Sequence, residues 1–307
     1  MTQAIEISGE RRVTVDCLGA RDGFPVFLLH GTPGSRVGPR PRGNVIYWSG
    51  VRLVCYDRPG YGGSDRHEKR AVADAAWDVL AIADKLGLER FSVIGRSGGG
   101  PHALACAALL DRQRVQSVVV LGGIAPPDAD ELAWTDGMTE SNVAEYELTR
   151  GGLDWVVAQL TKRINEIRKD PESLLHELDK ELTGSDRKVV NDVGIRRQLI
   201  DTYTEALRAG PYGWIDDVLA FRRPWGFDLG KINVPVLLWH GEEDVFSPLS
   251  HTQWLAEKIP TAHLHIESGA AHFNTVEILP KLLAQLKAGR TSEGLRVKRP
   301  HQPALSS

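Results

Sequence analysis

Residues 93–104 have the sequence VIGRSGGGPHAL, in which a strand pattern, a glycine-rich turn and a helix pattern follow one another. The apolar run at 91–94 predicts a strand, and the pattern at 103–110 predicts a helix. Between them lies Gly-x-Ser-x-Gly, centred on Ser97. A serine in so tight a strand–turn–helix connection is expected to have a strained backbone, and the flanking glycines let strand and helix approach closely. Ser97 is therefore a candidate nucleophile.

The motif alone leaves two interpretations open, because Gly-x-Ser-x-Gly also occurs as an ordinary glycine-rich turn. If the serine reacts, the following helix presents free N–H groups, beginning with that of Gly98, toward the place where negative charge develops. A serine hydroxyl is a weak nucleophile that needs a base, and the base needs an acid to orient it. Those groups must come from elsewhere in the chain.

Length, composition and charge bound the class of protein. The chain has 307 residues, of which 42% are hydrophobic and 25% charged, as in a globular protein of one large domain or of one domain with a sizeable insertion. A net charge of -3 gives no broad electrostatic basis for binding nucleic acid or an anionic membrane. No apolar run approaches the roughly 18 residues of a spanning helix. The expected partner is a small-molecule substrate, and a homo-oligomer is left open.

Cysteine usage and the N-terminus indicate a cytoplasmic protein. Cys17, Cys55 and Cys106 are widely spaced within predicted strands or a helix, which is typical of free thiols in a reducing compartment. The first residues show no signal-peptide pattern. No Cys-x-x-Cys or His-Glu-x-x-His spacing is present, so neither a metal nor another cofactor is predicted.

Strand and helix patterns alternate along most of the chain. Two short strands are predicted within 5–18, and further strands at 25–29, 51–56, 115–121, 234–239 and 262–267. Helices are predicted at 45–49, 71–86, 249–258 and 276–286. This succession predicts a parallel sheet covered by helices, in which binding sites lie beyond the carboxyl ends of the strands.

The alternation stops between residues 126 and 225, where helical patterns carry many charges. Three helices are predicted, at 153–167, 174–182 and 193–207, with residues 211–214 interrupting them. We expect a helical cap over the site, whereas the alternative is a solvated helical domain with another use. The predicted domains are a core at 1–125 and 226–289, a cap at 126–225 and a disordered tail at 290–307. Four tryptophans are candidates to line a pocket or to fill the core: Trp134, Trp155, Trp214 and Trp225.

An acid and a histidine follow the serine in the order that a Ser-Asp-His arrangement on such a sheet requires. Asp244 lies just past one predicted strand, and His272 lies in a small-residue loop past the next. His272 is expected to accept the Ser97 proton at Nε2, with Asp244 holding Nδ1–H. Rival histidines are His251, His263 and His265, and rival acids are Glu242, Glu243 and Asp128.

The second donor to an oxyanion is expected from the loop after residue 29. Pro33 has no N–H, so the Thr32 amide is predicted to act beside that of Gly98. The amides of Gly34 and Ser35 are weaker alternatives. His30 is expected to brace the loops.

Several ordered motifs together resemble those of the α/β-hydrolase superfamily. They are HGTPG at 30–34, DRPGYGGS at 57–64, GRSGG at 95–99, HGEED at 240–244 and GAAHF at 269–273. The resemblance covers residues from about 5 to 288. It implies an α/β fold with a mostly parallel eight-stranded sheet flanked by helices, a helical cap inserted after the sixth strand, and a Ser-Asp-His triad. The first motif is similar to that of prolyl iminopeptidases.

The residues and the resemblance predict a serine hydrolase that cleaves a small ester, thioester or related acyl substrate through an acyl-enzyme. Alternatives on the same triad are prolyl-aminopeptidase-like, perhydrolase, C–C bond hydrolase or lyase activity, and a ligand-binding homologue without turnover. The predicted cap has no acidic pair that can be assigned to a substrate amine, which disfavours the peptidase. Gly100, an extra glycine after the motif, is expected to allow a wider opening.

Overall fold

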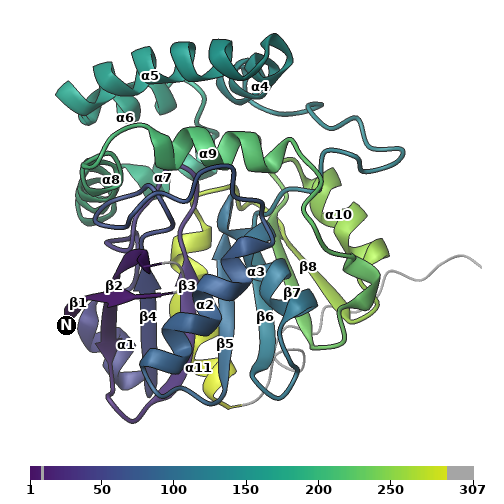
Figure 1. Ribbon diagram of the computed structural model, residues 1–307. Helices are drawn as coiled ribbons and strands as arrows, with labels where there is room; N and C mark the ends of the chain where they lie inside the picture. Colours follow the sequence, from purple (N-terminus) through teal and green to yellow (C-terminus); the bar gives the residue numbers. More distant parts are fainter. Residues whose placement is uncertain (8–9, 289–307) are drawn as a thin grey trace, which may run out of the picture.

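The computed structural model describes residues 1–7 and 10–288 (Figure 1). One sheet holds eight strands: β1 Thr2–Glu6, β2 Arg12–Gly19, β3 Phe24–Leu29, β4 Val51–Tyr56, β5 Phe91–Arg96, β6 Val115–Leu121, β7 Val236–Gly241 and β8 Ala262–Glu267. Their order is β1-β2-β4-β3-β5-β6-β7-β8. The pairs β1–β2 and β2–β4 are antiparallel, and every other neighbouring pair is parallel. The predicted fold class, a mostly parallel eight-stranded sheet flanked by helices, is confirmed.

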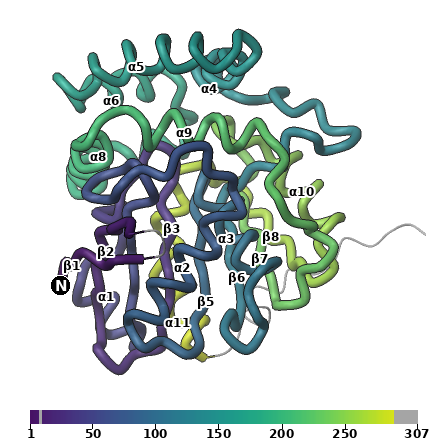
Figure 2. The backbone as a smooth tube through the Cα atoms, in the orientation of Figure 1, coloured from purple at the N-terminus to yellow at the C-terminus, as the bar shows by residue number. Residues whose placement is uncertain are grey.

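Helices cover both faces of the sheet (Figure 2). The elements are α1 Gly43–Trp48, α2 Asp74–Lys85, α3 Gly99–Leu109, α10 Leu249–Lys258 and α11 Thr275–Lys287. Alternate residues of each strand point to opposite faces, so Phe27 and Leu29 of β3 join the apolar cluster with α2, α3 and α10. Val26 and Leu28 join the cluster with α1 and α11 on the other face. The near-continuous apolar run of β3 is the sequence signature of such two-sided burial.

Six helices between β6 and β7 lie above the sheet, and we refer to α4–α9 as the helical layer (Figure 1). They are α4 Glu140–Glu147, α5 Leu153–Lys169, α6 Glu172–Leu178, α7 Gly184–Val190, α8 Val193–Ala206 and α9 Tyr212–Phe221. The layer has its own apolar cluster, which Tyr61, Phe246 and Phe273 of the sheet loops join. These aromatic contacts position the layer over the loops that follow the strands.

The break that the sequence predicts at 211–214 lies at 207–211, between α8 and α9, so residues 212–214 are helical, contrary to the prediction. Tyr212 begins α9, and Pro211 directly precedes it, a place where the missing N–H of proline costs no helical hydrogen bond. A Cβ at Gly213 would lie 2.6 Å from Cγ of Tyr61, so this glycine permits close packing of α9 on the loop after β4. Helices α4 and α7, of 8 and 7 residues, were also not predicted.

The remaining sequence expectations have separate outcomes. Cys17, Cys55 and Cys106 are free thiols. Trp134 and Trp225 are buried in the main apolar cluster, whereas Trp155 is 51% exposed and belongs to neither core nor site. None of the helices in the described part of the chain is both long and apolar enough to cross a bilayer. The tail predicted at 290–307 lies outside the described residues.

Candidate active site

Ser97 follows directly on β5 and stands at the N-terminal end of α3. Its φ is +52°, a left-handed conformation that non-glycine residues seldom adopt, which agrees with the strain expected of the turn. A Cβ at Gly95 would overlap the carbonyl of Gly99, and a Cβ at Gly99 would overlap that of Leu29. Both glycines are therefore needed for the close approach of strand and helix. The helix begins at Gly99, four residues before the predicted start.

The sequence analysis expects Gly100 to allow a wider opening of the site, and the structure contradicts this. Gly100 is buried, and a Cβ there would lie 2.8 Å from Cγ1 of Val120 and 3.2 Å from Cα of Gly123. The glycine therefore lets α3 pack closely against β6 and the turn that follows it. The physical reason is the helical turn itself, which rotates position 100 away from the site and toward the sheet.

Asp244 and His272 are brought together from the ends of adjacent strands. Asp244 lies three residues beyond β7, and its Oδ2 is 2.8 Å from Nδ1 of His272, which lies in the loop after β8. Its other oxygen, Oδ1, accepts the amides of Phe246 and Ser247 at 2.9 Å each. Both side chains are buried. The carboxylate is thus fixed on one side by two amides and oriented toward the imidazole on the other.

The two groups shift each other's pKa in a consistent way. Burial lowers the pKa of His272, but the charge and hydrogen bond of Asp244, with a further contribution from Asp186, outweigh burial and leave the pKa raised. Burial also raises the pKa of Asp244, but the facing imidazole outweighs it, and the pKa is lowered. The pair therefore favours an ionised carboxylate that stabilises a protonated imidazole.

The rival histidines have other positions and partners. His251 bonds the amide of Ala125 at 3.0 Å and the carbonyl of Trp134 at 2.8 Å. His265 lies within β8 and faces Glu267 at 2.8 Å, and His263 is exposed on the same strand.

The rival acids are likewise bound elsewhere. Glu242 accepts from Ser268 at 2.7 Å, and Glu243 accepts from Ser185 at 2.7 Å. Asp128 lines a different hollow. Asp244 alone of these four acids contacts His272.

One cavity of about 90 Å³ is lined by Ser97, His272 and Thr32 together with side chains of the helical layer. Within residues 1–7 and 10–288, no hydrogen bond joins Ser97 to His272. A nucleophile and its base are often apart in a free enzyme and close only with substrate bound. Ser97 and His272 thus line the same cavity.

Thr32 and Gly98, the predicted oxyanion donors, are in contact with each other. A Cβ at Gly98 would overlap Oγ1 of Thr32, which places the two residues in contact. In the described part of the chain, neither amide donates a hydrogen bond to another protein group. Two free donors next to Ser97 are what a negatively charged oxygen at this position would require. His30 braces the loop, as expected, since its ring contacts the carbonyl of Gly31 and the amide of Arg58.

A buried ionic cluster, which the sequence analysis missed, fixes the Thr32 side chain. Asp217 of α9 accepts from Oγ1 of Thr32 at 2.6 Å and from the hydroxyl of Tyr61 at 2.8 Å. Arg58 and Arg70 each form an ion pair with it at 2.6 Å. Their charges outweigh burial and hold the pKa of Asp217 well below its usual value. The signal in the sequence was the acidic pair 216–217 inside the apolar segment that forms α9.

A second carboxyl group lies beside the His272 loop. Asp186 of α7 is fully buried, and its Oδ1 accepts the amide of Phe273 at 2.6 Å. Burial raises the pKa of Asp186 to about 6 despite the opposing effect of His272. The helical layer thus contributes a titratable group next to the candidate base.

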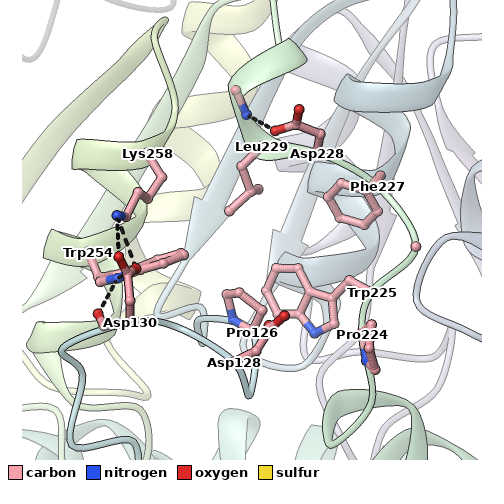
Figure 3. Close-up of a pocket in the computed structure, with 12 residues that line it drawn as sticks. Pro126, Asp128, Asp130, Pro224, Trp225, Phe227, Asp228, Leu229, Trp254 and Lys258 are labelled. Atoms are coloured by element: carbon pink, nitrogen blue, oxygen red, sulfur yellow. Dashed lines mark hydrogen bonds and ion pairs between the residues drawn. The ribbon is translucent and has the colours of Figure 1, made fainter.

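A larger hollow of about 650 Å³ lies away from Ser97 (Figure 3). Trp225, Phe227 and Trp254 line it, and Lys258 pairs with Asp130 at 3.0 Å across one side. Its lining includes no serine, cysteine or histidine. The described ranges also contain no group of three or more His, Cys, Asp or Glu arranged to hold a metal ion. Of these two hollows, only the one at Ser97 is lined by a candidate nucleophile and a candidate base.

Comparisons with known proteins agree with the fold. A family model described as "alpha/beta hydrolase fold" matches residues 25–154. The 2-hydroxymuconate semialdehyde hydrolase of Pseudomonas putida is 25% identical over 269 residues, 83% of each chain. A 2-hydroxy-6-oxononadienedioate/2-hydroxy-6-oxononatrienedioate hydrolase of Cupriavidus pinatubonensis is 27% identical over 254 residues, 81% of this chain and 80% of its own. The structure of a bromoperoxidase from Bacillus anthracis superposes with a TM-score of 0.68 at 22% identity, covering 94% of this chain and all of the other, and shows the same fold.

Proposed function

Because the chain belongs to the α/β-hydrolase superfamily of enzymes, we propose that it is a serine hydrolase that cleaves a small ester, thioester or related acyl compound through Ser97, His272 and Asp244. The observation that carries this proposal is the buried Asp244–His272 pair, 2.8 Å apart, in one cavity with a strained serine. Two free amides beside that serine support the same reaction.

The proposed reaction proceeds through an acyl-enzyme. Nε2 of His272 takes the proton of Ser97 as Oγ forms a bond to the substrate carbonyl carbon, and the amides of Thr32 and Gly98 hold the oxyanion. The carbonyl double bond re-forms, the bond to the leaving alcohol or thiol breaks, and the imidazolium protonates that group. A water molecule then gives its proton to His272 and attacks the carbonyl carbon of the Ser97 ester. The bond from that carbon to Oγ breaks, the imidazolium returns its proton to Oγ, and the acid is released.

We further propose that residues 126–225 form a cap domain that selects the substrate. The cavity wall includes Glu145 of α4, Tyr203 of α8 and Trp214 of α9, all from the helical layer. Side chains from five of its helices reach the cavity, so the layer encloses most of the space opposite Ser97. Such enclosure excludes water and places the acyl group near the nucleophile.

An aminopeptidase is disfavoured by the state of the one acid in this wall. Glu145 accepts from Nε1 of Trp214 at 2.8 Å and from Arg163 at 3.1 Å, so both of its oxygens already have partners. Burial raises its pKa against the opposing charge of Arg163. A carboxyl group so engaged offers little to a substrate ammonium group.

Hydrolysis of a carbon–carbon bond is the second candidate. The relatives from P. putida and C. pinatubonensis are named as hydrolases of 2-hydroxymuconate semialdehyde and of 2-hydroxy-6-oxononadienedioate or 2-hydroxy-6-oxononatrienedioate, which are not simple esters. The same base and oxyanion donors can serve that reaction, because it also places negative charge on a carbonyl oxygen. Turnover of a 2-hydroxy-6-oxo dienoate without turnover of p-nitrophenyl esters, acyl thioesters or proline arylamides would identify this candidate.

Labelling with a fluorophosphonate tests the proposal. We expect one adduct by intact mass, absent in Ser97→Ala and slowed by about 10³-fold or more in His272→Ala, because removal of one triad member abolishes most of the catalytic effect. His263→Ala is the matched control, since that histidine is exposed on β8, and it should label as the wild type does. A folded wild-type protein that neither labels nor turns over any acyl compound would instead be a ligand-binding homologue.

A further inference from the structure

Among the residues that the structure describes, none is a counter-ion to the guanidinium of Arg96, the residue before Ser97. Arg96 lies at the end of β5 and lines the cavity of Ser97 and His272, as well as a small hollow beneath the loop that follows β3. A Cβ at Gly31 would lie 3.8 Å from its Nη2. Across the described residues, no acid lies within ion-pair distance of this guanidinium and no protein group accepts a hydrogen bond from it.

Other arginines around this site are paired, which makes Arg96 an exception. Arg58 and Arg70 share Asp217 at 2.6 Å each, and Arg163, which also lines the cavity, pairs with Glu145 and Glu177 at 3.1 Å each. The fold thus provides a carboxylate for each of these cations but none for the one beside the nucleophile.

A second donor without a partner lies in the same wall. Tyr203 of α8 is only 6% exposed and lines the cavity, and its hydroxyl makes no hydrogen bond to any described residue. Burial raises the pKa of Tyr203 to about 12 although the Arg96 charge opposes this, so its hydroxyl remains a donor. The guanidinium and the phenol in this wall thus have donors for an oxyanion that no described residue accepts, since Glu145 of the same cavity is engaged by Trp214 and Arg163.

The charge of this space has an energetic consequence. Burial lowers the pKa of Arg96, but an arginine stays protonated in proteins. Arg96 is half-buried, so its charge is only partly solvated, and an anionic ligand gains more here than at a fully exposed arginine. The planar guanidinium suits a carboxylate, which it can bind through two parallel hydrogen bonds.

We infer that Arg96 and Tyr203 form a subsite for a carboxylate carried by the acyl part of the substrate, a conclusion that rests on the proposed hydrolase function of Ser97. Arg96 and Ser97 are consecutive residues lining a cavity of about 90 Å³. The carboxylate must therefore lie only a few bonds from the carbonyl that is attacked. The substrate class is a short dicarboxylic acid attached through one end as an ester or thioester.

The test compares two substrates that differ only at the far end of the acyl chain. Monoethyl glutarate carries the carboxylate, and ethyl pentanoate replaces it with a methyl group; ethanol release reports both. We expect the wild type to prefer the anionic ester, and Arg96→Gln to lower the ratio of the two kcat/KM values by about 100-fold, the effect of removing hydrogen bonds to a charged group. Arg96→Lys keeps the charge but loses the two-pronged contact, so its ratio should fall by about 10-fold. Tyr203→Phe should also lower the ratio by about 10-fold.

Arg197→Gln is the matched control, because it removes an exposed arginine of the helical layer that does not line the cavity and is paired with Asp201 at 3.0 Å. Its ratio should stay within a factor of about three of the wild type. If Arg96→Gln reduces turnover of both esters equally, or the wild type shows no anionic preference while Ser97 still labels, the inference is wrong and the hydrolase proposal stands.

If Ser97 does not label and neither ester is cleaved, glutarate binding decides. A glutarate-induced rise in Tm of the wild type but not of Arg96→Gln supports the subsite, and no rise overturns it.

Discussion

Two buried aspartates each hold a residue of the candidate site, and they have opposite kinds of partner. Asp217 faces Arg58 and Arg70, whose charges are permanent, and it anchors Thr32 and Tyr61. Asp244 faces one imidazole, whose charge depends on its protonation. The first cluster keeps the same charge throughout a reaction, whereas the second can take up and return a proton.

The role of each buried aspartate, structural or catalytic, depends on the partner that it faces. Burial opposes ionisation of both carboxylates, yet the pKa of each is lowered, in Asp217 mainly by two guanidinium groups and in Asp244 mainly by His272. Removal of the carboxylate that faces permanent charges should lower the stability of the fold, because buried charges are left unpaired. Removal of the carboxylate that faces a titratable imidazole should lower the rate of the reaction. Substitutions at the two aspartates should therefore separate stability from catalysis.

The largest effect is expected from Asp244→Asn on the rate of ester cleavage. The amide can still accept the Phe246 and Ser247 amides, so the fold should be retained. It no longer stabilises the imidazolium and favours the wrong tautomer of His272. The kcat should fall by about 10⁴-fold, the loss known for the equivalent change in a serine protease. Steady-state turnover of a p-nitrophenyl ester measures it.

Glu243→Gln is the control for this substitution, because Glu243 is the neighbouring residue and contacts Ser185 instead of His272. Its kcat should stay within about threefold of the wild type. A loss of less than tenfold in Asp244→Asn would show that another group orients the base.

The next effect, on stability, is expected from Asp217→Asn. An amide cannot neutralise Arg58 and Arg70, which are 1% and 2% exposed, so two buried cations lose their counter-ion. The free energy of unfolding should fall by about 3–5 kcal/mol. Urea denaturation followed by circular dichroism measures the change, and the rate at a temperature where the variant is folded should fall far less than in Asp244→Asn.

Asp216→Asn provides the comparison at the adjacent position of α9. Asp216 pairs with Arg66, which is 31% exposed, so water can replace part of that contact. The expected cost is about 1 kcal/mol. Equal costs at positions 216 and 217 would contradict the view that the Asp217 cluster is the structural anchor.

The same comparison explains what sequence patterns could predict. The strand patterns and the glycines around Ser97 depend on neighbours within a few residues, so the sheet and the turn were predictable. Asp244 and His272 each follow a strand, and parallel topology brings such loops to one edge. Their contact was therefore predicted from order alone.

The Asp217 cluster was not predictable in this way. Arg58 and Asp217 are separated by 159 residues, and no local pattern pairs them. The start of α9 was misjudged for a related reason, because Pro211 and Gly213 are helix-breaking signals in isolation but are accommodated by the helix start and by contact with Tyr61. Long-range packing overrode local preference in both cases.

The smallest effect, on pH dependence, is expected from Asp186→Asn. The pKa of His272 is raised, after burial, by Asp244 and to a lesser extent by Asp186, whereas Arg96 lowers it. His272 acts as a base only when neutral, so kcat/KM should fall as the pH drops through this raised pKa. Removing the Asp186 charge should lower the pKa and move this acid limb toward lower pH, with the carbonyl of the new amide still able to accept the Phe273 amide.

The change should be seen mainly above pH 6, because Asp186 itself has a pKa of about 6 and carries little charge below it. The stability that comes from His272 should change with pH in the opposite direction to kcat/KM. Because folding raises the pKa of His272, this residue stabilises the folded protein fully below the unfolded pKa of about 6.5. That contribution is lost as the pH rises through the folded pKa. A kcat/KM profile from pH 5 to 9 measures the limb. Asp179→Asn, at an acid paired with Arg196, should leave it in place. A limb that moves toward higher pH in Asp186→Asn would mean that Asp186 acts on His272 through loop position, not through charge.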